Sequence, residues 1–311
     1  MRYDDFRRSD DIEDRRGDDG GGMGGGGGFG LPMGGGGLGI GTIIVLGIVG
    51  YAFGIDPRIL IGGAEILTGG SQSPSYQSDR RSAPAKTGAP TDEMGSMISG
   101  VLGEIDDRWS EIFRERGQTY SGPRIVLFKN ATNGGRCGRA ESAMGPFYCP
   151  PDKQIYLDTG FFRQVETRFR GCSGNACKFT AAYIIAHEAG HHIQNLTGIL
   201  SKVQQAQQRA GSKAEANALQ VRVELQADCF SGVWVNREEK KRPGFLEAGD
   251  IDAALTTASA IGDDTLQRQS TGRVVPDSFT HGSAAQRKQW FMTGYQKGTV
   301  EACNTFAASN L

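Results

Sequence analysis

The 311-residue sequence has almost no net charge, no visible internal repeat and only four histidines, and each of these shortages limits the classes of protein to which it can belong. Its 34 basic and 35 acidic residues give a formal net charge of −1, so nothing marks the whole chain as a nucleic-acid binder. Apolar residues make up 38%, too few for a polytopic membrane protein. The 47 glycines follow no three-residue period, which excludes a collagen, and no repeat of about 20–50 residues suggests a solenoid.

The first 37 residues read as a disordered tail. Residues 1–19 carry five Arg and eight Asp or Glu, and residues 20–37 are mostly glycine. Such a composition offers too little apolar surface to offset the entropy lost on ordering.

Residues 38–55 (LGIGTIIVLGIVGYAFGI) predict one transmembrane helix and thus a membrane-associated protein. Eighteen residues in a helix span roughly 27 Å, enough for a bilayer core. A signal-peptide core is the first alternative, but the segment starts late and follows an acidic leader. A buried soluble helix is the second, but polar residues and glycine flank the segment on both sides.

The distribution of basic residues predicts the orientation of this helix. Five Arg precede it, whereas only Arg58 lies within 20 residues after it. The bias favours an inside N-terminus and places all that follows on the outer side of the membrane. Residues 56–93, rich in Pro and Ser towards their end, are expected to be a linker, and residues 94–311 a folded domain.

Within 94–311 the patterns predict an α+β fold. Apolar residues recur at helical spacing from Met97 to Ile112, and Gly117 can end that helix. Residues 123–129 and 153–158 read as strands, and the patterns after residue 160 are mostly helical. We therefore expect a small sheet followed by a helical half.

Six cysteines follow the expected membrane helix, and their even number fits an oxidising compartment. Proximity along the chain favours the pairs Cys137–Cys149 and Cys172–Cys177, which leaves Cys229–Cys303. Reduced buried thiols are the alternative. A cysteine zinc site fits less well, because no second closely spaced pair completes four ligands.

Two of the four histidines form His187-Glu188-Ala189-Gly190-His191, an HExxH motif after an apolar run. On a helix, residues i and i+4 share a face, so both imidazoles can bind one metal ion, here one Zn²⁺ per chain. Glu188 would then lie beside the metal-bound water as general base. His192 points about 100° away from that face and is expected to pack or to bind a polar partner rather than the metal.

A second helix supplies two carboxylates, Glu224 and Asp228, again four residues apart. Ser212 can cap its start, and Gly198 can end the preceding helix so that the two pack side by side. We assign Glu224 as the third zinc ligand. Asp228 is expected to bind the far nitrogen of a ligating histidine, most plausibly His187, and to fix its tautomer. A surface carboxylate is the alternative for Glu224.

HEAGHHIQ followed by ELQAD resembles the gluzincin pattern HExxH…ExxxD. The wider context, YCPPDKQIYLDTGFF and SFTHGSAAQRKQWF, resembles the bacterial family called putative neutral zinc metallopeptidases over nearly the whole chain. This resemblance implies a zincin-like peptidase domain behind one membrane helix, held on the outer side of the bacterial cytoplasmic membrane.

Thr280-His281-Gly282 with Arg287 resembles the Thr-His-Pro…Arg element of membrane-linked gluzincins of the HtpX and CAAX-protease kind, with Gly282 in place of the proline. By that resemblance, His281 would stabilise the oxyanion and Arg287 would support it nearby. A histidine that merely packs on a helix start is the alternative.

These residues predict a zinc-dependent peptidase acting on a peptide or protein substrate. Zinc lowers the pKa of its water, Glu188 takes the proton, and the hydroxide attacks a peptide carbonyl. Extended substrate could add as a strand near residues 144–149. A non-catalytic envelope protein with a structural zinc is the alternative, although a closed structural site needs no Glu188. Hydrolysis of cell-wall peptide crosslinks is a third reading.

Overall fold

The computed structural model describes residues 1–17, 86–167, 172 and 176–311. The expected membrane helix at 38–55 lies outside these residues, as does most of the expected linker. In the part that is described, no helix combines the length and the hydropathy that a membrane span requires.

A five-stranded mixed sheet is ordered β2-β1-β3-β7-β6. Its strands β3 (Arg124–Phe128) and β7 (Gln154–Asp158) are parallel, with Ile125 opposite Ile155, and confirm the two predicted strands. Strand β6 (Phe147–Cys149) runs antiparallel to β7 and forms one edge. A separate hairpin joins β4 (Ala131–Asn133) to β5 (Arg139–Glu141). The sheet with the helices described next confirms the α+β prediction.

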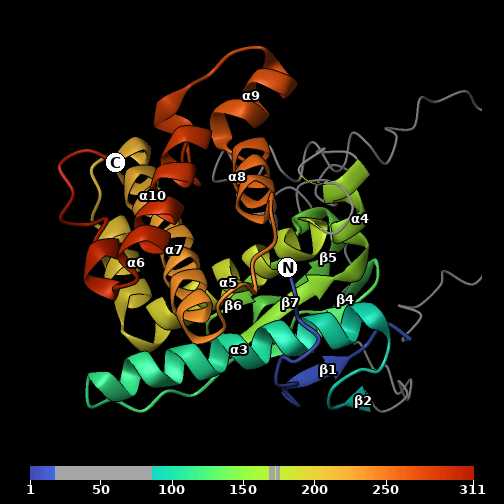
Figure 1. The fold of residues 1–311 in the computed structure, drawn as a ribbon. Coiled ribbons are helices and arrows are strands. Elements are labelled where there is room, and N and C mark those ends of the chain that lie inside the picture. The colour runs from blue at the N-terminus through green and yellow to red at the C-terminus, as the bar shows by residue number, and fades with distance from the viewer. Residues whose placement is uncertain (18–85, 168–171, 173–175) are drawn as a thin grey trace, which may run out of the picture.

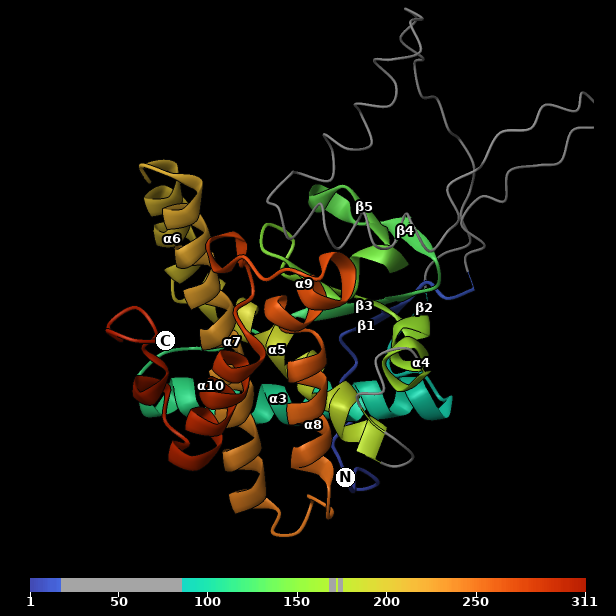
Figure 2. The same cartoon turned by 90° about the horizontal axis from the view of Figure 1, so that it is seen from above.

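Helices make up the rest of the domain, and in Figure 1 α3 runs below the other helices, with β1 and β2 below it in turn. Figure 1 and Figure 2 both place α6, α7 and α10 away from the β1–β2 end of the sheet. The helices are α3 (Glu93–Glu115), α4 (Thr159–Thr167), α5 (Ala176–Leu196), α6 (Ile199–Gln208), α7 (Lys213–Lys241), α8 (Asp250–Ala260), α9 (Asp263–Thr271) and α10 (Ala284–Lys297). Short 3₁₀ turns lie at Gly135–Cys137, Ser142–Met144, Pro276–Ser278 and Val300–Cys303.

The helix ends follow local signals in the sequence. Asp92 caps α3 by accepting a hydrogen bond from the backbone of Gly95, and Gly117 follows its end with a positive φ. Gly198 separates α5 from α6, as expected. Ser212 caps α7 through the backbone N–H of Glu215, while the Glu215 side chain accepts from Gly211 rather than from Ser212.

The N-terminal segment is a folded part of the domain, so the prediction of a disordered tail is wrong for residues 1–17. Strand β1 (Ile12–Asp14) lies between β2 (Lys86–Thr87) and β3, pairing with β3 in parallel. Because Lys86–Thr87 form strand β2, they belong to the folded domain, and the linker expected at residues 56–93 is shorter than predicted. Ile12 is fully buried, and Phe6 is nearly so. Charged residues and glycine dominate the first 37 residues, so their composition gives no sign that these few apolar residues are buried.

The approach of this segment to α3 depends on a small residue. Ser9 and Ser99 exchange two hydrogen bonds, Ser9 N–H to Ser99 C=O at 3.1 Å and Ser99 Oγ–H to Ser9 C=O at 2.8 Å. The backbone N–H of Arg7 donates to the buried Glu104 at 2.8 Å. A side chain at Gly103 would collide with the backbone carbonyl oxygen of Arg7, so α3 needs glycine there.

The three expected disulfides are present: Cys137–Cys149, Cys172–Cys177 and Cys229–Cys303. The last joins α7 to the 3₁₀ turn near the end of the chain across 74 residues. It therefore lowers the conformational entropy of a long stretch of the unfolded chain.

Gly103→Ala is expected to destabilise the protein by about 1–3 kcal/mol, because its Cβ meets the rigid backbone of Arg7. This outcome opposes the gain of about 1 kcal/mol that alanine normally brings to a helix interior. Gly100→Ala is the matched control, since its Cβ meets chiefly the flexible end of Arg8. Urea unfolding and limited proteolysis of residues 1–17 measure both effects. Equal stability of the two variants would contradict the docking of this segment.

Candidate metal centre

The site forms where α5 crosses α7. Gly190 lies at the contact, since a Cβ there would stand 3.0 Å from the Cα of Ala227. That close approach brings the HExxH face of α5 against the carboxylate face of α7. The surroundings are apolar, and His187, Glu188 and Glu224 are all buried.

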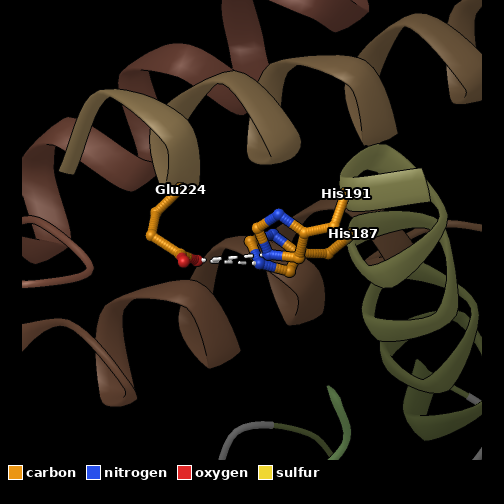
Figure 3. Close-up of side chains that lie close together, drawn as sticks. All are labelled: His187, His191 and Glu224. Atoms are coloured by element: carbon orange, nitrogen blue, oxygen red, sulfur yellow. Dashed lines mark hydrogen bonds and ion pairs between the residues drawn. The ribbon is translucent and has the colours of Figure 1, made fainter. Parts of the chain in front are cut away.

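His187, His191 and Glu224 converge as the sequence predicts (Figure 3). Their candidate ligand atoms all lie within 4.8 Å of one another. The Nε2 atoms of His187 and His191 stand 3.2 and 3.5 Å from the same carboxylate oxygen of Glu224. Two imidazole nitrogens and one carboxylate oxygen form the ligand set of many catalytic zinc sites.

The far nitrogens of the two imidazoles are both engaged, which fits a metal site. His187 Nδ1 lies 2.8 Å from Asp228 Oδ1, as expected, and His191 Nδ1 lies 2.9 Å from Gln194 Oε1. Each ring thus presents Nε2 towards the other ligands. Hydrogen bonds of this kind orient metal-binding histidines and fix their tautomer.

Asp228 on α7 is fully buried and accepts hydrogen bonds from two other helices, α5 and α10. Besides His187 on α5, the hydroxyl of Tyr183 donates to it at 2.6 Å. Arg287 on α10 donates from Nε at 2.9 Å and from a terminal nitrogen at 3.0 Å. Burial raises the pKa of Asp228, but Arg287 and His187 outweigh it and hold that pKa well below its usual range.

The position of Arg287 corrects its expected role. The guanidinium is buried and donates its hydrogen bonds to Asp228 and Tyr183. It acts instead through Asp228, by balancing the charge of the carboxylate that holds His187.

Glu188 lies beside the two imidazoles with its carboxylate buried. Burial raises its pKa above the usual value of 4.5, although the nearby His191 and His187 partly oppose the shift. No hydrogen bond from the described residues contributes to that pKa. A carboxylate with a raised pKa and no fixed partner is suited to accept and return a proton.

His281 approaches the site from the loop before α10. It is close enough to Glu224 for its charge to help hold the Glu224 pKa low, with His191 and His187 contributing more, against the opposing effect of burial. Asp263 fixes this loop: its Oδ2 accepts from the backbone of Thr280, His281 and Gly282 at 2.7, 2.6 and 3.0 Å. Its Oδ1 lies 3.2 Å from His281 Nδ1, so one buried carboxylate orients both loop and ring.

His192 binds polar partners, as expected. Its Nε2 donates to the Ser121 carbonyl at 2.6 Å, so Nδ1 accepts from the Tyr148 hydroxyl at 2.9 Å. Burial lowers its pKa to about 4, which keeps the ring neutral. Because Tyr148 belongs to β6, this pair fixes the edge strand to the helix that carries the HExxH motif.

Three supporting residues escaped the sequence reasoning: Tyr183, Gln194 and Asp263. Tyr183 and Gln194 lie four residues before His187 and three after His191, so helical spacing alone could have found them. Asp263 lies 18 residues before His281 on a different helix, and no local pattern joins the two.

The chain matches the family described as putative neutral zinc metallopeptidase over residues 1–306. It is 45% identical over 309 residues to the uncharacterized protein YpfJ of Escherichia coli (strain K12), covering 99% of this chain and 100% of that protein. It is 38% identical over 267 residues to the uncharacterized protein Rv2575 of Mycobacterium tuberculosis (strain ATCC 25618 / H37Rv), covering 83% and 85%. No solved structure matches the chain significantly.

Zinc affinity is expected to rise with pH between about 6 and 8. Burial lowers the pKa of His187, but Asp228 and Glu224 outweigh it and raise that pKa to about 10. The pKa of His191 is also raised, by Glu224 against burial. The metal-free rings therefore hold protons that zinc must displace, and each displaced proton changes the dissociation constant about tenfold per pH unit. Chelator competition at several pH values measures this, and a pH-independent constant would contradict it.

Proposed function

Because the chain belongs to the putative neutral zinc metallopeptidase family, we propose that it is a zinc-dependent peptidase with a zincin-like catalytic domain. The observation that carries the proposal is the convergence of His187, His191 and Glu224 with Glu188 buried alongside them. Zinc would be held by the first three residues, one ion per chain.

Each residue of the site has a defined part in peptide hydrolysis. Zinc, when bound, supplies a Lewis acid that lowers the pKa of water towards about 7. Glu188 accepts a proton from the attacking water and later delivers it to the leaving amine. His281, oriented by Asp263, donates a hydrogen bond to the oxygen that becomes negative in the transition state.

The edge strand β6 supports a peptide as substrate. Among the described residues its outer edge is not paired with another strand, and the Tyr148–His192 bond holds it against α5. An extended chain can add there by main-chain hydrogen bonds, which places a peptide bond near the HExxH helix without requiring one particular sequence.

The alternative, a non-catalytic envelope protein with a structural zinc, accounts for the three ligands but not for Glu188. A structural site closes all four metal positions with protein ligands, and the described cluster has three. A buried carboxylate beside an open position is unfavourable unless it serves the chemistry.

The disulfides and β1 support a proposal for the location of the domain. All six cysteines are paired, which supports an oxidising compartment outside the cytoplasm. Since β1 pairs with β3, residues 1–17 share that compartment with residues 86–311. A single crossing by residues 38–55 would separate these parts, so we propose that any membrane contact leaves both on one side.

Glu188→Gln is expected to retain one zinc per chain and to lower kcat by about 10²–10⁴, because the ligands remain and the base is lost. Glu301→Gln, at an exposed carboxylate, serves as the control. Elemental analysis and a casein assay provide the two readouts. If Glu188→Gln loses its zinc, the residue is a ligand rather than a base; if it keeps full activity, the mechanism is wrong.

His281→Ala is expected to lower kcat by about 10²–10³ while zinc content and melting temperature persist, as removal of one oxyanion donor does. Asp263→Asn should produce a smaller loss, since it removes the charge that orients the ring but keeps much of the loop. An unchanged kcat in His281→Ala removes the residue from the mechanism. Loss of zinc or of folding in that variant indicates a structural role.

Cysteine labelling in cells tests the shared compartment. Asp4→Cys and Lys213→Cys each place a thiol at an exposed position, and the native cysteines are all in disulfides. A membrane-impermeant maleimide should label both variants from the outer face of spheroplasts. Labelling of Lys213→Cys alone before permeabilisation would show that the N-terminal segment lies on the other side.

A further inference from the structure

We propose that two buried glutamines, Gln194 and Gln226, form an amide chain that positions His191 as a zinc ligand and connects it to the disulfide Cys229–Cys303. The inference rests on the proposed metal site. It concerns how one ligand is held, which neither the family match nor the HExxH motif specifies.

The chain consists of consecutive hydrogen bonds from the ligand to the end of the fold. His191 Nδ1 lies 2.9 Å from Gln194 Oε1. Gln194 Nε2 donates to the Val223 carbonyl at 2.7 Å and to Gln226 Oε1 at 3.1 Å. Gln226 Nε2 donates to the Cys303 carbonyl at 2.9 Å. Both glutamines and Cys303 are buried, so water does not compete for these bonds.

The two carbonyl groups determine which way each amide faces. A backbone carbonyl only accepts, so Val223 and Cys303 must each receive an amide N–H. Gln226 therefore turns its oxygen to Gln194, and Gln194 turns its oxygen to His191. An oxygen opposite Nδ1 requires an N–H there. The chain thus selects the tautomer of His191 that leaves Nε2 for the metal.

His191 and His187 are held by groups of different charge. Asp228 provides His187 with a carboxylate that Arg287 balances, whereas Gln194 provides His191 with a neutral oxygen. A carboxylate at position 194 would need its own cation in this buried setting. The amide chain orients the second ring without adding charge beside Glu224 and Glu188.

The disulfide anchors the remote end of the chain. Cys303 lies in a 3₁₀ turn, and its bond to Cys229 fixes that turn to α7. Cys229 directly follows Asp228, so the same segment of α7 supports both histidines. The Cys303 carbonyl, which accepts from Gln226, and the Asp228 carboxylate, which binds His187, are therefore connected through the disulfide Cys229–Cys303.

Gln194→Met tests the chain, because methionine keeps the length of the side chain but presents no oxygen to Nδ1. We expect zinc affinity, measured by chelator competition, to fall roughly 10- to 100-fold. The imidazole Nδ1–H signal of His191 in ¹H–¹⁵N spectra should weaken or shift.

Two further variants separate positioning from packing. Gln226→Met breaks the link to Cys303 but leaves Gln194 bound to Val223, so its affinity should fall less than that of Gln194→Met. Gln267→Met removes a buried glutamine of α9 that bonds Ser278 and Val275, and should lower the melting temperature without changing zinc affinity.

The outcomes distinguish this inference from the proposed function. If the native protein binds no zinc, the metal site itself is wrong. If the native protein binds zinc and Gln194→Met binds it equally well, or if Gln267→Met weakens binding as much as Gln194→Met does, the amide chain has no positioning role.

Discussion

The buried carboxylate of Asp228 is the interaction on which the site most depends. It receives hydrogen bonds from α5 and α10 while lying on α7, so three helices meet at one group with no exposure to solvent. A buried charge is tolerated only when it is fully paired, and removing one partner typically destabilises a protein by about 3–5 kcal/mol. Arg287 therefore belongs to the metal site, although it lies behind His187 and touches no ligand position.

The start of α10 joins this interaction to the loop that carries His281. Ser283 caps the helix in a complete capping box with Gln286, and this fixes the turn from which Arg287 projects inwards. Directly before the cap, Asp263 holds the loop that carries His281. A displacement of this one helix start would move both the group that balances Asp228 and the group expected to meet the developing oxyanion.

Sequence reasoning found what short-range patterns encode and missed what distant segments determine. His187 and His191 lie on one helix face, and Glu224 and Asp228 on another, so helical spacing and one packing assumption sufficed to predict the ligands. The strands at 124–128 and 154–158 could also be predicted, because each lies in a run of mostly apolar residues. By contrast, residues 1–17 look like a solvated tail in isolation, because the surfaces that make them fold, such as β3 and the face of α3 at Gly103, lie far away in the sequence. The prediction for Arg287 missed its partner for the same reason, because Asp228 lies 59 residues away in the sequence.

The charge balance of the centre links metal binding to the protonation of its two imidazoles. Glu224 raises the pKa of both imidazoles, and both Nε2 atoms face the same oxygen of Glu224. A dication would take over the charge that these protons carry, while Asp228 and Gln194 keep both rings in place. Binding then becomes an exchange of protons for an ion within a prearranged set of ligands. Glu188 lies next to this exchange, and burial raises its pKa while the nearby His191 and His187 lower it.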